Sequence, residues 1–206
     1  MPLSFFIKGT VIGFSIAAPV GPIGVLCIRR SLAEGSRMGL ATGLGAATAD
    51  ALYGAVAGFG LTAISAFLVR QQFWLALIGG IFLCYLGVRT FISKPAAEAA
   101  DSREGRGLLW SYATTLVLTL TNPATILSFV AVFAGFGLGA ASDYGAASML
   151  VMGVFMGSAL WWLMLSTGVS QLRIRMGNHW MRAVNRFSGA WLFAFGVYAL
   201  SRLLVR

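Results

Sequence analysis

Long apolar segments separated by short polar stretches dominate the chain. A membrane-spanning helix needs about 20 apolar residues, and six segments reach that length. They are Leu3–Ile28, Gly39–Val69, Phe73–Ile92, Leu108–Phe136, Ala146–Val169 and Phe187–Leu204. This pattern predicts an all-α integral membrane protein with six transmembrane helices.

The most polar stretch lies in the middle of the chain, between the third and fourth apolar segments. It contains the charged residues Lys94, Glu98, Asp101, Arg103, Glu104 and Arg106, together with Pro95. Stretches of this composition are typical of flexible linkers between compact units. We therefore expect two three-helix halves, residues 1–93 and 108–206, joined by a linker over residues 94–107.

Prolines interrupt the first and fourth apolar segments near their middles. The first interruption is Pro19-Val20-Gly21-Pro22 and the second is Asn122-Pro123. Proline removes a backbone donor and clashes with the preceding turn, so it ends or kinks a helix. It is nevertheless favoured at the first position of a new helix, after a residue such as glycine or asparagine. We therefore expect half-helices that begin at Pro22 and Pro123, near the membrane midplane.

The two halves of the sequence match at three places in the same order. The first place is Gly21-Pro22 with Asn122-Pro123, the second is Asp50 with Ser158, and the third is the spaced pair Gly80 and Gly87 with Gly189 and Gly196. Each half has three predicted spans, an odd number, so the second repeat should be inverted relative to the first. Interrupted helices at corresponding positions of inverted repeats point to the binding site of a secondary transporter.

The composition agrees with a membrane location. The chain is 58% hydrophobic and 10% charged, with a mean hydropathy of +0.84, whereas soluble proteins carry about 25% charged residues. A net charge of +9 would suggest nucleic acid as the partner of a soluble protein. Membrane proteins instead concentrate Arg and Lys in cytoplasmic loops, so we expect lipids and no nucleic acid as partners.

The loop charges predict an orientation in the membrane. The first loop is expected to carry Arg29, Arg30 and Arg37, and the third and fifth loops are also basic. The second and fourth loops offer only Arg70 and Asp143. The positive-inside rule then places loops one, three and five in the cytoplasm and both termini in the periplasm.

The two helix breaks and one acidic residue carry the candidate chemistry. A helix start presents unpaired N–H groups and a partial positive charge, which suits a carboxylate. Asp50 is the only acidic residue well inside a predicted span, where a buried carboxylate is costly. It could bind a substrate ammonium group, carry a coupling proton, or hydrogen-bond a broken helix to hold the fold. The candidate substrate or proton site comprises Pro19, Gly21, Pro22, Asp50, Tyr53, Thr121, Asn122, Pro123 and Ser158.

Four Gly-x-x-x-Gly spacings predict close helix packing, either within the chain or between the two copies of a homodimer. They begin at Gly9, Gly39, Gly54 and Gly153. The two cysteines, Cys27 and Cys84, have neither CxxC nor metal-ligand spacing. We therefore expect no metal and no cofactor.

Several short motifs together cover nearly the whole chain. They are Pro19-Val20-Gly21-Pro22, Arg30-Ser31-Leu32-Ala33-Glu34-Gly35 with Gly39-Leu40, Gly45 and Asp50, and Asn122-Pro123. In this order and spacing they resemble the lysine-exporter (LysE/RhtB-type) family of bacterial amino-acid efflux proteins. The resemblance implies a proton-driven exporter of amino acids or their derivatives in the bacterial inner membrane, and not an enzyme. Many family members have Gly-Pro-Gly-Pro at the first motif and vary at the position of Asp50, so the resemblance fixes neither the substrate nor the role of this residue.

Two other functions fit the same scaffold less well. A divalent metal-ion exporter needs several oxygen ligands for a hard cation, or cysteine and histidine for a soft one, and a single intramembrane carboxylate is a poor set. A membrane thiol–disulfide electron carrier needs cysteines at matched positions of the two repeats. However, Cys27 aligns with Ser128 and Cys84 aligns with Phe193. A secondary exporter of small zwitterions that alternates access around a midplane site is the favoured hypothesis.

Overall fold

A computed structural model of the chain gives the fold. The residues that it describes are 2–19, 21–59, 67, 70–92, 107–122, 125–126, 128–129, 144–173 and 178–204. Seven helices account for nearly all of these residues, so this part of the chain is all-α, as the sequence predicts. The helices are α1 (Pro2–Ala17), α2 (Pro22–Glu34), α3 (Ser36–Gly58), α5 (Gln72–Phe91), α6 (Leu108–Leu120), α8 (Tyr144–Arg173) and α9 (Asn178–Leu204).

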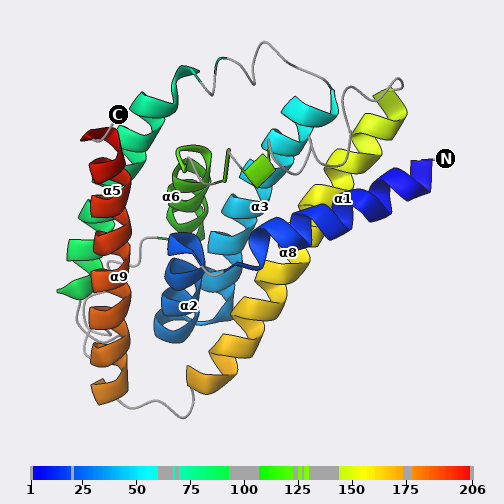
Figure 1. Ribbon diagram of the computed structural model, residues 1–206. Helices are drawn as coiled ribbons and strands as arrows, with labels where there is room; N and C mark the ends of the chain where they lie inside the picture. The colour runs from blue at the N-terminus through cyan, green and yellow to red at the C-terminus, as the bar shows by residue number, and fades with distance from the viewer. Residues whose placement is uncertain are drawn as a thin grey trace.

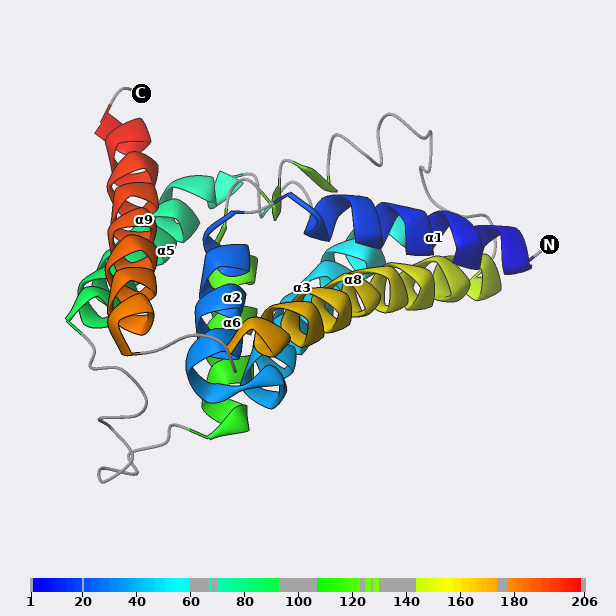
Figure 2. The ribbon, with the colours of Figure 1, turned by 90° about the horizontal axis from the view of Figure 1, so that it is seen from below.

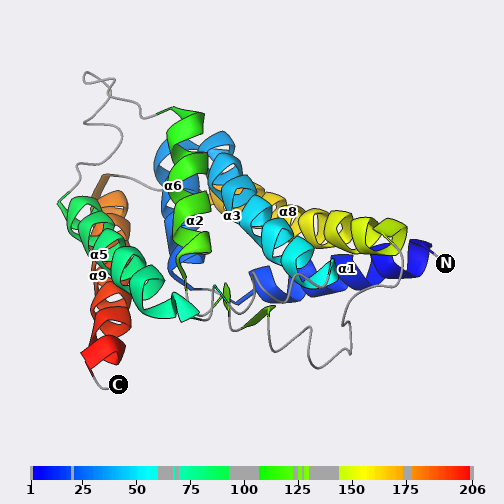
Figure 3. The same cartoon turned by 90° about the horizontal axis from the view of Figure 1, so that it is seen from above.

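Helix α2 stands at the centre of the arrangement. It contacts α3, α6, α8 and α9. Helices α5 and α9 form a closely packed pair on one side of it, and α1, α3 and α8 pack together on the other side (Figure 1). The view from above shows the same division, with the two termini at opposite sides of the molecule (Figure 3). The α5–α9 pair therefore faces α2 and α6 across the interior of the protein.

The first helix break lies where the sequence places it. Helix α1 ends at Ala17 and α2 begins at Pro22, with Gly21 in an extended conformation as its N-cap. The two helices are bent by 81° relative to each other, and this corner is plain when the molecule is seen from below (Figure 2). The N–H of Gly21 donates to the carbonyl of Pro19 at 2.9 Å, which closes the turn between them. The prediction of a half-helix beginning at Pro22 is confirmed.

The prediction that Arg29 and Arg30 lie in the first loop is wrong. Helix α2 continues through both residues to Glu34, and Gly35 alone separates it from α3. Gly35 has a φ of 95°, a conformation that only glycine adopts without strain, so the chain reverses there without a polar loop. The helix can run on because the Arg30 side chain has partners inside the protein and does not need water.

Fewer than six of the described helices are both long enough and apolar enough to cross a membrane. Helices α5 and α8 each qualify as a span, and α1 with α2 qualifies as one broken span. Helix α3 has 23 residues, but glycine, alanine and threonine make up much of it. Helix α6 is apolar but only 13 residues long.

The second helix break is partly described. Helix α6 ends at Leu120, two residues before Asn122. The carbonyl of Asn122 accepts hydrogen bonds from the N–H groups of Thr125 and Ile126, at 3.1 and 3.3 Å, so a new turn begins there. Pro123, the expected first residue of the second half-helix, lies outside the described residues.

The glycine pairs at the crossing of α1 and α8 bring these two helices into backbone contact. A Cβ added at Gly9 would meet the backbone of Gly153 at 3.1 Å, and one added at Gly157 would meet that of Phe14 at 2.9 Å. Gly54, on α3, also faces α8, where a Cβ would lie 3.4 Å from the side chain of Val154. These Gly-x-x-x-Gly spacings therefore serve packing within the chain.

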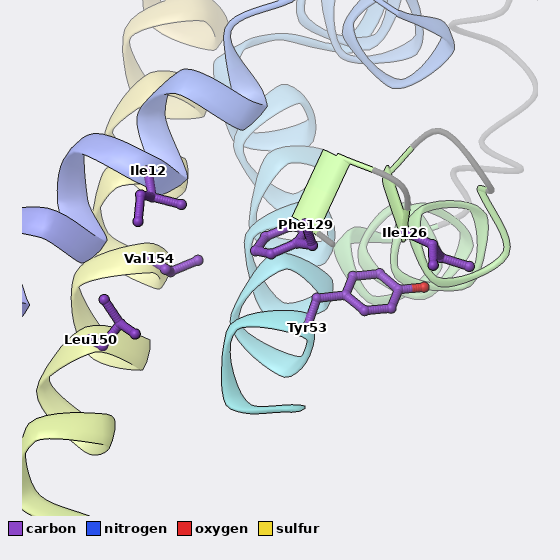
Figure 4. Packing of buried hydrophobic residues seen from close by; sticks show 6 residues of the cluster. All are labelled: Ile12, Tyr53, Ile126, Phe129, Leu150 and Val154. Atoms are coloured by element: carbon purple, nitrogen blue, oxygen red, sulfur yellow. The ribbon is translucent and has the colours of Figure 1, made fainter. Parts of the chain in front are cut away.

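An apolar cluster joins the second break to the helices around it. It contains Ile12, Tyr53, Ile126, Phe129, Leu150 and Val154 (Figure 4). The Tyr53 and Phe129 rings lie 5.5 Å apart between centroids. Ile126 and Phe129, which follow the second break, are thus packed against residues of α1, α3 and α8.

A candidate substrate cavity at the helix breaks

A cavity of about 700 Å³ lies at the two helix breaks, and all seven described helices contribute to its lining. Six of the residues singled out from the sequence line it: Pro19, Gly21, Pro22, Asp50, Thr121 and Asn122. These residues are up to 103 positions apart along the chain (19 to 122) and come from both halves. The structure therefore brings the two breaks and Asp50 to one space.

The start of α2 forms one part of the cavity wall. Pro22 occupies the first helical position, and Ile23 and Gly24 follow it in the lining. Their N–H groups have no partner within the helix, since the first intrahelical donor is Val25, which bonds to Gly21. Gly21 has no side chain with which to cap them. This end of α2 therefore offers hydrogen-bond donors and a partial positive charge to the cavity.

Asp50 forms a second part of the wall and is held by a short chain of hydrogen bonds. Its side chain is 3% exposed. The Ser158 hydroxyl donates to Asp50 Oδ2 at 2.7 Å, and Trp162 Nε1 donates to the Ser158 oxygen at 3.1 Å. Because an indole N–H can only donate, the serine accepts from Trp162 and directs its own proton at Asp50. Among the described residues, Asp50 Oδ1 has no such partner.

Two of the other predicted site residues, Tyr53 and Ser158, are not among the described residues that line the cavity. Ser158 acts one step behind Asp50, through the hydrogen bond just described. Tyr53 donates its hydroxyl to the carbonyl of Leu120 at 2.6 Å. That carbonyl is at the last residue of α6, so Tyr53 holds the end of the helix at the second break. Pro123 is not among the described residues.

Sequence reasoning missed a polar cluster around a buried arginine. Arg30 is 5% exposed and sits between α2, α3 and α6. Its guanidinium donates to Thr42 Oγ1 at 2.9 Å, to the Ser111 carbonyl at 3.0 Å, and to the hydroxyls of Thr114 and Thr115 at 3.0 and 3.3 Å. The three residues of α6 recur at i, i+3 and i+4 within an apolar helix. That stripe was the sequence signal for an internal polar partner.

The cavity wall supplied by α5 and α9 was also missed. Phe73, Ala76 and Leu83 come from α5, and Phe195 and Ala199 from α9. Nothing in the sequence separates an apolar residue that faces a cavity from one that faces lipid. These positions could be assigned only once the two helices were placed.

The two cysteines lie apart from the described lining of the cavity. Cys27 is buried and its thiol donates to the carbonyl of Gly39 at 3.4 Å. Cys84 lies between α5 and α9, 3.9 Å from the carbonyl of Phe193. The described residues contain no group of three His, Cys, Asp or Glu side chains that could hold a metal ion.

Apolar helices and a broken helix at the edge of a cavity are typical of membrane-embedded transporters. Residues 14–203 match the family model described as LysE type translocator, and the chain belongs to this family. It is a transporter and not an enzyme.

Two curated proteins are similar to the chain over most of its length. The "Putative amino acid efflux protein YcgF" of Bacillus subtilis (strain 168) is 29% identical over 202 residues, which cover 95% of each chain. The "Uncharacterized membrane protein YahN" of Escherichia coli (strain K12) is 27% identical over 176 residues, 84% of this chain and 77% of that protein. No solved structure matches the chain. The family match identifies the chain as a translocator.

Proposed function

We propose that the protein is a secondary exporter of amino acids or related small zwitterions, coupled to protons and working by alternating access. The observation that carries the proposal is the shared cavity of Asp50 and the start of α2. A zwitterion has one cationic and one anionic group, and the cavity offers one group of complementary charge for each. The printed name of the Bacillus subtilis relative supports an amino acid as substrate.

The two ends of the substrate would bind different walls. The carboxylate would accept hydrogen bonds from the N–H groups of Ile23 and Gly24 at the start of α2, where the helix dipole is favourable. The ammonium group would meet Asp50 at Oδ1, the oxygen that faces no described partner. Thr121 and Asn122 would complete the site from the second break, and Pro123 belongs to it by its place in the sequence.

Asp50 is also the proposed proton site. Its Oδ2 atom already accepts a hydrogen bond from the Ser158 hydroxyl, so a bound proton would reside on Oδ1. A proton and a substrate ammonium group would then compete for the same oxygen. Release of the ammonium on protonation, and binding on deprotonation, is the exchange that proton-driven export requires. Ser158 is the positioning residue in this scheme.

We also propose that the chain consists of two inverted repeats, residues 1–93 and 108–206, joined by the linker 94–107. Reciprocal contacts support this arrangement. A Cβ added at Gly87 would lie 2.8 Å from the carbonyl of Gly189, and one added at Gly196 would lie 2.8 Å from that of Gly80. The sequence pairs Gly80 with Gly189 and Gly87 with Gly196. Contacts that are exchanged between matched positions in this way are the mark of a two-fold axis.

Two further observations support the same axis. Asp50 and Ser158 are matched positions and bond directly to each other. A Cβ at Gly45 would clash with the carbonyl of Tyr112 and lie 3.0 Å from the N–H nitrogen four residues later, at Leu116. Gly153 follows Gly45 at the same distance along the chain as Ser158 follows Asp50. A Cβ at Gly153 would meet the same two kinds of atom, the carbonyl of Phe6 and the N–H nitrogen of Thr10.

The location and orientation of the protein in the cell are also proposals. We place the protein in the bacterial inner membrane with six spans, both termini in the periplasm and loops one, three and five in the cytoplasm. Because Arg29 and Arg30 lie within α2, the basic residue nearest the connection between α2 and α3 is Arg37, at the start of α3. Cysteine accessibility at the two termini tests this orientation.

The purified protein in lipid vesicles tests the proposed transport directly. Vesicles are loaded with a mixture of amino acids, a pH gradient is imposed, and released compounds are measured by mass spectrometry. We expect release that depends on the protein and ceases when a protonophore collapses the gradient. Release no faster than from protein-free vesicles would refute the proposal.

A further inference from the structure

The cavity has two walls of different chemistry. The wall made by α2, α3 and α6 contains the start of α2, Asp50, and the hydroxyl groups of Thr119 and Thr121. The wall made by α5 and α9 contains Phe73, Ala76, Leu83, Phe195, Ala199 and Leu203. The groups proposed for the ammonium and the carboxylate of the substrate all belong to the first wall.

The described residues of the second wall offer no charge to a substrate. Among the described lining residues Asp50 is the only acid, none is basic, and Tyr198 is the only polar side chain that α5 and α9 contribute. The sequence of residues 60–69 and 123–142, which lie largely outside the description, contains no Asp, Glu, Lys, Arg or His. The neighbouring segments of the predicted spans therefore supply no second charge either.

We infer that the exported substrate has an uncharged, apolar side chain, aliphatic or aromatic, that lies against α5 and α9. This inference rests on the proposed function, because it assigns Asp50 and α2 to the backbone groups of the amino acid. A basic side chain would place a second cation on the apolar wall without a carboxylate, and an acidic one would place an anion there without a cation. Burying an unpaired charge in apolar surroundings is strongly unfavourable.

The size of the cavity agrees with a side chain of substantial volume. Sites for small molecules measure about 300–1,000 Å³, and this cavity measures about 700 Å³. A small polar amino acid would leave much of the apolar wall without contact. Each additional methylene that fills such a wall improves discrimination by about tenfold or more. Large apolar side chains are therefore favoured over small ones as well as over charged ones.

A competition among substrates tests this inference. Vesicles containing the full-length protein are loaded with equal amounts of leucine, phenylalanine, alanine, serine, lysine and glutamate, and the release of each is followed. We expect leucine and phenylalanine to leave at least about tenfold faster than lysine or glutamate. Release of lysine, glutamate or serine at the same rate as leucine would overturn the inference and leave amino acid export standing. Release of none of the six would overturn both the proposed function and the inference.

A pair of substitutions on one helix locates the side-chain site. Ala199 lines the cavity, whereas Ala194 is exposed on the outside of the same helix. Ala199→Leu should lower phenylalanine release relative to alanine release by about tenfold, because the added methyl groups occupy the side-chain space. Ala194→Leu should leave that ratio unchanged. A ratio that is equal in wild type and in Ala199→Leu would contradict the placement against α9.

Discussion

Replacement of Gly153 by alanine should separate two helices that are now in backbone contact. A Cβ at this position would clash with the carbonyl oxygen of Phe6 and lie 2.8 Å from the nitrogen of Thr10 and 3.0 Å from Cα of Gly9. All three neighbours are backbone atoms of α1, so no side chain can rotate away. Either α1 moves away from α8 or the strain remains, and overpacking of this kind costs about 1–3 kcal/mol.

The matched control is Gly168→Ala on the same helix. Gly168 is exposed, and a Cβ there would meet no atom within 4 Å. Both changes gain the same helix propensity, about 1 kcal/mol, so that gain cancels in the comparison. The free energy of unfolding of Gly153→Ala should therefore be about 1–3 kcal/mol below that of Gly168→Ala, measured by reversible unfolding in mixed detergent micelles. Equal stability of the two variants would refute the backbone contact between α1 and α8.

Three further substitutions test individual hydrogen bonds. Tyr53→Phe should lower the free energy of unfolding by about 0.5–1.5 kcal/mol, because the last carbonyl of α6 loses its donor; an unchanged value would show that the bond contributes nothing. Arg30→Lys should cost about 1.5–3 kcal/mol, since one ammonium nitrogen cannot serve the separate acceptors that the guanidinium reaches; a wild-type unfolding curve would contradict this. Ser158→Ala should slow gradient-driven release by about tenfold or more, the equivalent of one hydrogen bond to a charged group, because Asp50 Oδ2 loses its donor. The control is Ser148→Ala, which changes an exposed serine whose hydroxyl bonds within its own helix and should leave the release rate unchanged. Equal release rates in the two serine variants would remove Ser158 from the mechanism.

The first helix break could be predicted from the sequence alone, and six of the nine candidate site residues line the cavity beside it. Proline ends or kinks a helix and is favoured at the first position of a new one, so the start of α2 at Pro22 could be predicted from the sequence. Asp50 could be singled out because a carboxylate at membrane depth needs a reason to be there. Its bond to Ser158 joins two positions that the sequence had matched as repeat partners and included in the candidate site.

The features that could not be predicted depend on how helices are placed against one another. Phe73 and Phe195 line the cavity, but an apolar side chain on an apolar helix has the same sequence signature whether it faces lipid or an interior space. Arg30 was assigned to a loop because it follows Ile28, the last residue of the first apolar segment. In the structure, neutral oxygens from two neighbouring helices bind its guanidinium instead, and only the fold brings them together.

The role of Asp50 is the central claim, and one measurement tests it most directly. Asp50→Asn keeps the size of the side chain and its ability to accept from Ser158, but it can neither exchange a proton nor carry a charge. Gradient-driven release of leucine from vesicles is compared for Asp50→Asn, for Glu34→Gln as a carboxylate-to-amide change outside the described lining of the cavity, and for the wild type. We expect Glu34→Gln to respond to the pH gradient as the wild type does, and Asp50→Asn to lose the response. An unchanged gradient-driven rate in Asp50→Asn would contradict the account.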